Sequence, residues 1–300
     1  MRIQSTDIVE TFAEAFKMWG ARVIVTAENA KWALAAATSM TGFATSVIGC
    51  KCEAALERII PSGETLDKRP GASILIFSTS AESLGKRLVE RIGQCVMTCP
   101  TTACYNGLDS PDTVLVGGQI RYFGDGYQSS KMLNGRRFWR IPVMDGEFLL
   151  DDRFGVQPAV GGGNLLLLGK NLSTTLRAAE AAVTAMRAIP NVILPFPDGV
   201  VRSGSKPGSR YKKLFASTND AYCPTLKAVA PQTQVIADAN CVLEIVIDGL
   251  DLQSVERAMV VGALAAAKEN VLQISAGNYG GNLGQYKIEL HKILSGQAKL

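Results

Sequence analysis

The sequence predicts an α+β fold of two ferredoxin-like (split β-α-β) lobes in tandem, each with inserted hairpins or loops. The first observation is that the 300 residues contain one order of predicted elements twice, two β-α-β units in each half. The second is a composition of 47% hydrophobic and 19% charged residues, which is typical of a globular protein with a sizeable core. The halves share little sequence identity, so the repeat is inferred from the order of elements.

The first half combines short apolar runs with one clearly amphipathic helix. Thr79 and Glu82 have the spacing of a capping box, which predicts a helix start here. The apolar residues that follow, from Leu84 to Val96, form one stripe at helical spacing. The predicted elements are strand 22–26, helix 31–40, strand 45–50, strand 72–77 and helix 82–96.

The second half repeats this order. Ser173 is expected to cap a helix whose apolar stripe runs from Leu172 to Met186. Pro190 ends that helix before the next strand. The other predicted elements are strand 164–168, strand 191–194, strand 242–247, helix 253–268 and strand 271–275.

The insertions differ between the halves. Residues 105–156 contain Asn134-Gly135 and Asp145-Gly146 between strand-like runs, which predicts two hairpin turns. Residues 197–232 are rich in Gly, Ser, Pro and basic residues, and a loop of that length in a compact domain usually has a function. We expect an N-terminal lobe of residues 1–156 with the hairpin insertion and a C-terminal lobe of residues 157–300 with the long basic loop.

Glu244 is the most unusual residue of the chain. It lies in Cys241-Val-Leu-Glu-Ile-Val-Ile-Asp248, a run that otherwise predicts a buried central strand. Burial of a carboxylate raises its pKa, and an acid that stays neutral near pH 7 can donate a proton and take it back. The alternatives are a strand with a wet second face and a glutamate paired with Lys or Arg, because ion pairs also perturb pKa values.

The long loop carries a basic cluster without an intervening acid. Its members are Arg202, Lys206, Arg210, Lys212 and Lys213. Such a cluster suits an anionic partner, and a solvated loop explains it equally well.

Two glycine-rich stretches, 161–164 and 277–284, permit positive φ angles or close approach of a ligand. Neither has the setting of a dinucleotide fingerprint or a P-loop. A tight turn without a ligand is the simpler interpretation, more so for the first stretch than for the second.

The seven cysteines predict neither a metal site nor a disulfide. Their number is odd, their spacings do not repeat, and His291 is the only histidine of the sequence. We expect reduced, mostly buried thiols. No apolar stretch is long enough to span a bilayer, and residues 1–20 contain acids and lack a hydrophobic region, so a cytoplasmic location is expected.

Several long strings resemble the formylmethanofuran–tetrahydromethanopterin formyltransferase family. The resemblance runs from about residue 6 to His291, and strings of this length are specific. They are Thr11–Phe16, Arg91–Thr98, Phe123–Gln128, Ala216–Thr225 and Ile274–Gly281. Within the family, the chain is most similar to the bacterial branch, as indicated by the strings 99–102, 121–123 and 200–206. In that branch the enzyme is the formyltransferase subunit of a formyltransferase/hydrolase complex, which serves formaldehyde oxidation in methylotrophs.

The resemblance implies transfer of a formyl group between methanofuran and N5 of tetrahydromethanopterin, or an analogue, through a tetrahedral intermediate. It implies these two co-substrates with acidic tails, no permanently bound cofactor or metal, and a homo-oligomer or a hydrolase complex. It assigns the catalytic role to Glu244. The substrate-binding residues that it implies are Arg202, Ser203, Ser205, Lys206, Arg210, Asn219, Asp220, Ser275, Asn278, Tyr279, Asp125 and Gln128.

Two other classes of function compete with the enzyme. One is a non-catalytic ferredoxin-like scaffold subunit of a multi-subunit complex, which has no reason to bury Glu244. The other is a nucleic-acid binder that uses the basic loop, but the net charge is only +4 and few aromatic residues interleave the basic ones. We therefore expect no nucleic-acid or membrane partner.

Overall fold

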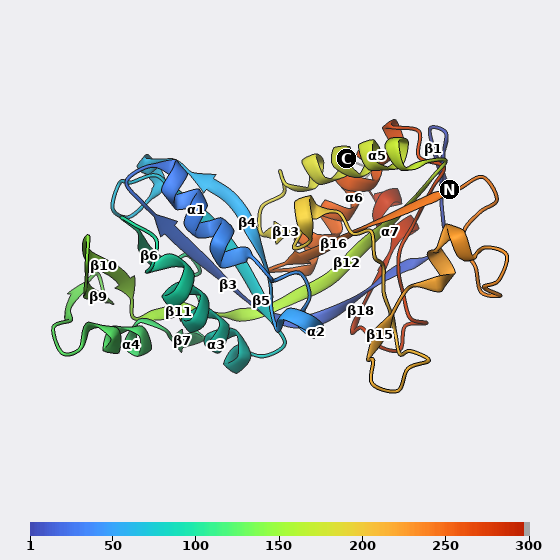
Figure 1. Ribbon diagram of the computed structural model, residues 1–300. Helices are drawn as coiled ribbons and strands as arrows, with labels where there is room; N and C mark the ends of the chain where they lie inside the picture. Colours follow the sequence, from blue (N-terminus) through green and yellow to red (C-terminus); the bar gives the residue numbers. More distant parts are fainter. Residues whose placement is uncertain (297–300) are drawn as a thin grey trace. The chain divides into compact units, whose positions relative to one another are not determined.

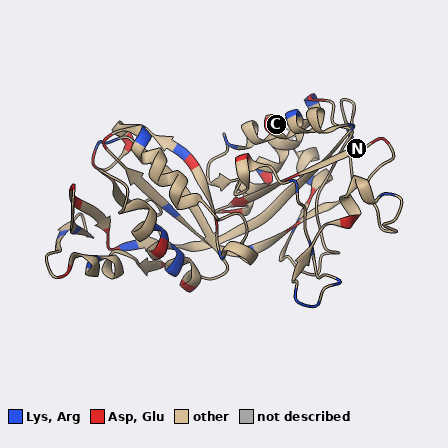
Figure 2. Cartoon of the chain, viewed as in Figure 1, with Lys and Arg blue, Asp and Glu red and all other residues tan. Residues whose placement is uncertain are grey.

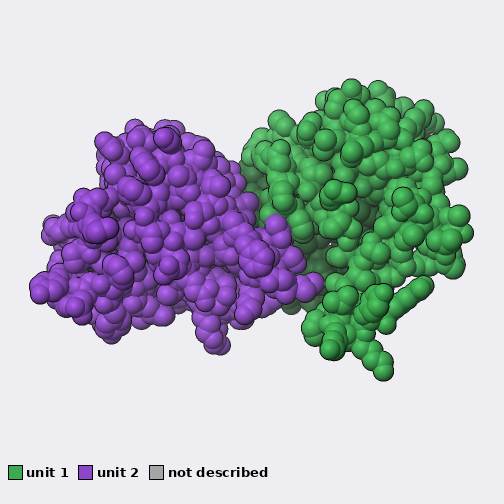
Figure 3. Space-filling view, viewed as in Figure 1, with its two compact units in different colours: residues 1–17, 160–300 green, residues 18–159 purple. Residues whose placement is uncertain are grey.

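The computed structural model describes residues 1–296 and divides the chain into two compact units, Met1–Lys17 with Val160–Leu300 and Met18–Ala159 (Figure 1, Figure 3). The division at Val160 lies close to the expected boundary at residue 156. The first 17 residues differ from the expectation, since they belong to the unit that contains residues 160–300. Strand pairing explains this, because β2 (Thr6–Ile8) pairs with β17 (Gln273–Ser275), and β18 (Tyr286–Glu289) pairs with the first residues of β3 (Phe12–Thr26).

Residues 18–159 form one ferredoxin-like lobe. Its four strands lie in the order β6-β3-β5-β4, and every neighbouring pair is antiparallel. This is the arrangement of two interleaved β-α-β units. The elements are β3 (Phe12–Thr26), α1 (Ala30–Thr41), β4 (Glu53–Ile60), β5 (Gly71–Ser78), α3 (Ala81–Arg91) and β6 (Ala103–Asn106).

Two details of this lobe correct the sequence prediction. The strand expected over 45–50 is wrong: the short helix α2 (Val47–Cys50) lies there, and the strand is β4. The charged Glu57 and Arg58 hid β4; the Glu57 side chain is only 7% exposed there and accepts a hydrogen bond from Arg22 at 2.7 Å. Helix α3 begins after Ser80 instead of Thr79, and a π turn, η2 (Ile92–Val96), continues it.

The two predicted hairpins extend the sheet of this lobe beyond β6. Leu133 pairs with Arg136, and both turn residues between them have positive φ, 50° at Asn134 and 78° at Gly135, as a type I′ turn requires. The second turn joins Val143 to Gly146. The elements of the insertion are β7 (Thr113–Leu115), α4 (Gly117–Ile120), η3 (Arg121–Gly124), β8 (Ser129–Leu133), β9 (Arg136–Val143), β10 (Gly146–Asp151) and β11 (Arg153–Gly155).

The other unit contains the second ferredoxin-like lobe. Its strands lie in the order β13-β16-β12-β17, again antiparallel throughout. Asn171 caps α5 and Asp251 caps α6, each accepting a backbone N–H with its side chain, so the expected cap at Ser173 is two residues late. The elements are β1 (Arg2–Ile3), β2 (Thr6–Ile8), β12 (Gln157–Gly169), α5 (Leu172–Met186), β13 (Val192–Ile193), β16 (Cys241–Gly249), α6 (Leu252–Lys268), β17 (Gln273–Ser275), β18 (Tyr286–Glu289) and α7 (Leu290–Gly296).

The two faces of this second sheet are covered differently. Helices α5 and α6 pack on one face, where Leu165, Leu243 and Ile245 join one large apolar core. The segment between β13 and β16 covers part of the other face, and Val235 packs there against Leu166. That segment contains the 3-10 turns η4 (Pro197–Gly199), η5 (Asp220–Tyr222) and η6 (Pro224–Leu226), and a two-stranded ribbon of β14 (Lys206–Pro207) and β15 (Ala216–Ser217). Figure 2 shows Lys and Arg without acids at the tip of the ribbon.

No helix within residues 1–296 is long and apolar enough to cross a bilayer. Strand β5 is buried along its whole length within this single chain. Strand β5 therefore does not by itself require cover from a second copy.

Candidate functional site

Glu244 projects from the sheet face opposite to α5 and α6. Its strand neighbour in β12 is Leu166, and Leu166 is in turn paired with Ser275 of β17. Directly opposed residues of antiparallel strands share a face, so the three side chains lie in one row across the sheet. Leu243 and Ile245, on either side of Glu244 in sequence, point into the helix-covered core.

The carboxyl group of Glu244 is placed to act as a weak acid. Burial raises its pKa to about 7, although part of the residue still reaches the surface. Within residues 1–296 its carboxylate oxygens form no hydrogen bond or ion pair, so the alternative of a glutamate paired with Lys or Arg does not apply to the described chain. A carboxyl with this pKa exchanges protons readily at neutral pH.

A pocket of about 300 Å³ opens over Glu244. Val201 forms an isolated bridge to the strand, with its N–H donating to the Glu244 carbonyl at 2.7 Å and the Glu244 N–H returning a bond at 3.0 Å. This bridge brings Arg202 and Ser203, both exposed, to the rim of the pocket. Asn219, also among the expected site residues, lines the same pocket.

The glycine-rich stretch after β17 returns to the same face. Asn164, which lies on the Glu244 face of β12, accepts the Gly277 N–H at 2.5 Å and donates to the Gly277 carbonyl at 3.2 Å. Two residues later, burial raises the pKa of the Tyr279 phenol, and the negative charges of Glu244 and Glu14 raise it further. The charge of Glu244 thus acts on the Tyr279 phenol, but Tyr279 is not among the residues that line the pocket over Glu244.

Two expected site residues of this region are bound within the protein. The Asn278 amide donates to the Thr11 hydroxyl at 3.0 Å and to the Phe12 carbonyl at 3.2 Å, so it anchors the loop. Ser275 is 2% exposed, and its hydroxyl lies 3.2 Å from the phenol oxygen of Tyr222, which also lines the pocket of Glu244.

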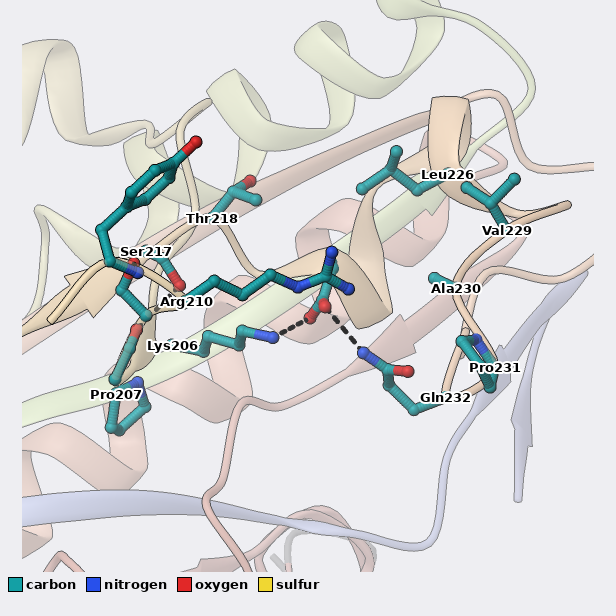
Figure 4. A pocket seen from close by; sticks show the side chains of 14 residues that line it. Lys206, Pro207, Arg210, Ser217, Thr218, Leu226, Val229, Ala230, Pro231 and Gln232 are labelled. Carbon is teal, nitrogen blue, oxygen red and sulfur yellow. Dashed lines mark hydrogen bonds and ion pairs between the residues drawn. The ribbon is translucent and has the colours of Figure 1, made fainter. Parts of the chain in front are cut away.

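A second pocket, of about 640 Å³, lies along the basic loop (Figure 4). Lys206 forms an ion pair with Asp220 at 2.6 Å, and Gln232 donates to the other carboxylate oxygen of Asp220 at 2.7 Å. Arg210 lines this pocket, is exposed, and has no ion pair among residues 1–296. Ser205 is exposed next to Lys206.

Asp125 and Gln128 belong to the other unit, Met18–Ala159. Asp125 ends η3 with a φ of 50°, and the Gln128 side chain accepts the Gly126 N–H at 2.9 Å. Both residues serve a local turn there. Their assignment to substrate binding stays a prediction from the resemblance.

Sequence reasoning missed Glu14 and Asn164 as residues that shape the site. Glu14 had a detectable signal, because it lies in an apolar strand just as Glu244 does. Asn164 had none, since its partner Gly277 is 113 residues away.

The described part of the chain, residues 1–296, contains no cluster of three or more His, Cys, Asp or Glu side chains suited to a metal ion. All seven cysteines are free thiols. Cys104 is fully buried, and burial raises its pKa.

Comparison with known proteins gives matches along almost the whole chain. The family model for formylmethanofuran–tetrahydromethanopterin formyltransferase matches residues 1–143, and the model for the proximal lobe of that family matches residues 146–293. The formylmethanofuran–tetrahydromethanopterin formyltransferase of Methylobacillus flagellatus is 53% identical, over 98% of this chain and 100% of the relative.

Solved structures agree with this match. A chain in the crystal structure of the formyltransferase/hydrolase complex from Methylorubrum extorquens with methylofuran has a TM-score of 0.95 and 49% identity, covering 98% of both chains. The formyltransferase from Methanosarcina barkeri has a TM-score of 0.92 and 45% identity, covering 98% of this chain and 100% of that one. With both lobes matched and Glu244 over a pocket in the second, the chain belongs to the formylmethanofuran–tetrahydromethanopterin formyltransferase family.

Proposed function

We infer that this chain transfers a formyl group between methanofuran and N5 of tetrahydromethanopterin, or close analogues of these carriers. The family relationship supports the reaction, and the buried carboxyl of Glu244 beside a pocket supports the site. The alternative from the sequence was a non-catalytic scaffold. It conflicts with the 53% identity, over 98% of this chain, to relatives that are named as formyltransferases.

Glu244 supplies the proton transfers of the proposed reaction. The N5 amine attacks the formamide carbon, and the carbonyl oxygen gains negative charge in the tetrahedral intermediate. Neutral Glu244 donates a hydrogen bond to this oxygen or a proton to the departing amine, and its carboxylate then accepts the proton that N5 loses. The bond from N5 to the formyl carbon forms first, and the C–N bond to the other carrier breaks when the tetrahedral intermediate collapses. The sum of these steps is neutral in protons and electrons, so no redox partner is needed.

The hydrogen-bonding groups around Glu244 suit the polar parts of two carriers. Arg202, Ser203 and Asn219 line its pocket, and the charge of Glu244 helps to raise the pKa of the Tyr279 phenol. Holding both carriers here converts a reaction of two molecules into one between fixed partners, which lowers the barrier. We assign the adjacent pocket, with Arg210 on its wall, to the acidic tail of one carrier.

Assembly is part of the proposal. The relative from Methylorubrum extorquens is named as one subunit of a formyltransferase/hydrolase complex. We propose that this chain also associates with further copies or with hydrolase-complex subunits, and that it acts in the cytoplasm. The relationship to a component of that complex supports the first part.

A direct transfer assay tests the proposed function. Purified chain is mixed with formylated methanofuran and tetrahydromethanopterin, and N5-formyl product is followed by mass spectrometry. Formation of the product in proportion to enzyme supports the assignment. No transfer in either direction, by folded chain supplied with both carriers, would contradict it.

A further inference from the structure

Glu14 is a buried carboxylate that receives four backbone N–H groups from one loop. The residue is 1% exposed and lies in β3. Its Oε2 atom accepts the N–H of Tyr279 at 2.7 Å and that of Gly281 at 3.0 Å. Its Oε1 atom accepts the N–H groups of Leu283 and Gly284, both at 2.5 Å. Almost every hydrogen-bonding position of the carboxylate is thus used by a single six-residue segment.

These bonds keep Glu14 charged. Burial alone raises the pKa of a carboxyl group, but here the four N–H groups outweigh it and hold the pKa of Glu14 below its ordinary value. No Lys or Arg within residues 1–296 forms an ion pair with it. The loop backbone therefore supplies the stabilisation of this charge, and the charge in turn orders the loop.

The loop sequence fits this role. Gly280 and Gly281 both have a φ of 73°, and in this turn the N–H groups of Tyr279 and Gly281 reach the same carboxylate oxygen of Glu14, while the Gly280 N–H donates to the Asn278 side chain. At Gly284 a Cβ atom would lie 2.5 Å from the Ala15 carbonyl oxygen and 2.6 Å from Glu14 Cγ. Only glycine lets the backbone come this close to the carboxylate.

The same loop contacts the Glu244 face at its start. Asn164 holds Gly277 there by the bonds described above, so the segment is fixed at one end by Asn164 and along the rest by Glu14. Tyr279 lies between the two anchors, and its N–H is itself a ligand of Glu14. Burial raises the pKa of its phenol, and the charge of Glu244 raises it further.

We propose that Glu14 is a positioning residue of the formyl-transfer site, which fixes the Gly277–Gly284 loop on the sheet face that carries Glu244. The inference rests on the proposed function only for its effect on turnover; the hold of Glu14 on the loop is independent of it. With the loop in place, this part of the sheet face is less open to water. Without Glu14, the loop detaches and more water reaches Glu244.

The test compares Glu14→Gln with Glu289→Gln. Glu289 lies on β18, is exposed, and pairs with Phe12 of β3 instead of with residue 14, so it controls for loss of an acid nearby. Hydrogen exchange with fragment resolution reports the amides of residues 279, 281, 283 and 284. The dependence of kcat on pH reports Glu244, and KM for each carrier is measured in the same experiments.

In Glu14→Gln we expect the four amides to exchange about 10-fold faster or more, because their acceptor is lost and the opening of the loop costs less. We expect kcat to fall by roughly 10- to 100-fold, as small misplacements in a site do, with a smaller change in KM. The pH limb near 7 that belongs to Glu244 shifts to lower pH, since its carboxyl is then better hydrated. Glu289→Gln leaves all three quantities as in the parent chain.

Faster exchange at the four amides with unchanged kcat and an unchanged pH limb would overturn the proposal, since Glu14 would then only stabilise the loop. Unaltered exchange would overturn it as well. If Glu14→Gln fails to fold, Glu14→Asp takes its place. This variant keeps the charge but moves the carboxylate oxygens away from the loop, so we expect a smaller rise in amide exchange and a smaller fall in kcat. Full activity of Glu244→Gln would instead contradict the proposed function, while the exchange result still reports on Glu14.

Discussion

Val201 and Glu244 exchange both of their backbone hydrogen bonds, at 2.7 and 3.0 Å, outside any regular strand pairing. The bridge places the first residues of the basic segment directly beside the buried carboxyl. A charged loop and a buried acid therefore meet at one edge of β16. The long loop thus contributes the wall of the pocket over Glu244.

The first prediction concerns the stability of the Glu244→Gln variant. The pKa of Glu244 is raised from 4.5 to about 7, so the folded chain binds more protons than the unfolded chain between these values. The stability that depends on neutral Glu244 is fully present below pH 4.5. It is lost as pH rises through 7, and the free energy of unfolding is lower by about 3 kcal/mol once Glu244 is fully ionised in the folded chain. Because glutamine does not titrate, the variant gains stability relative to the parent as pH rises.

Urea unfolding at pH 5 and pH 8 measures this difference. We expect the difference in the free energy of unfolding, variant minus parent, to be roughly 1–3 kcal/mol larger at pH 8 than at pH 5. An equal difference at both pH values would show that the pKa of Glu244 is ordinary.

The second prediction concerns the basic loop. Arg210 has no ion pair in the described chain, whereas Lys206 is engaged by Asp220. Arg210→Gln is therefore expected to raise KM for one carrier about 5-fold or more with little effect on kcat, because contacts to a tail are equal in the ground and transition states. The effect shrinks as salt rises.

Steady-state kinetics with each carrier at low and high salt checks this. Arg177→Gln, an exposed position on α5 on the helix-covered face, is the control. If both variants give the parental KM for both carriers at low salt, the loop is a solvated one. Neutralising Lys206 as well adds a structural effect, since Asp220 loses its partner.

The third prediction concerns Gly284. A Cβ atom there would lie 2.5 Å from the Ala15 carbonyl oxygen, which cannot move without disturbing β3. We expect Gly284→Ala to destabilise the loop and to lower the melting temperature by several degrees, as a loss of about 1–3 kcal/mol implies. Gly63→Ala is the control, because nothing lies within 4 Å of a Cβ atom at that position. Equal melting of the two variants would show that the loop adapts freely.

The fourth prediction is that the active chain is not a monomer. The prediction is based on the relationship to a subunit of a larger complex. Burial of β5 gives no further reason for it, because this strand is already covered within one chain. Light scattering coupled to gel filtration, at several protein concentrations, gives the mass. A mass near 32.0 kDa at every concentration, with full activity and no co-purifying subunit, would refute it.

The split β-α-β order, the two hairpins and the unusual position of Glu244 were all predictable from the sequence. Each depends on local periodicity, turn residues or a single charge in an apolar run. Strand β4 was not predictable, because its Glu57 is satisfied by Arg22, 35 residues away. A charged residue in a buried strand resembles a surface residue unless its partner is known.

The loop anchor shows the same limit. Glu14 and the Tyr279 N–H are 265 residues apart, and no pattern in either segment indicates the pairing. The attachment of residues 1–17 to the second half is likewise set by strand pairing between distant segments. Contacts of this kind depend on the folded topology and not on local propensity.

Turnover of Glu244→Gln tests the central claim most directly. Glutamine keeps the size of the side chain and removes the proton that is transferred, so kcat is expected to fall about 100-fold or more, within the range of general acid–base groups. Glu180→Gln, an exposed acid on α5, is the control and retains parental turnover. A kcat in Glu244→Gln within a few-fold of the parent, in a chain that melts cooperatively, would contradict the assignment of Glu244 as the proton-transfer group.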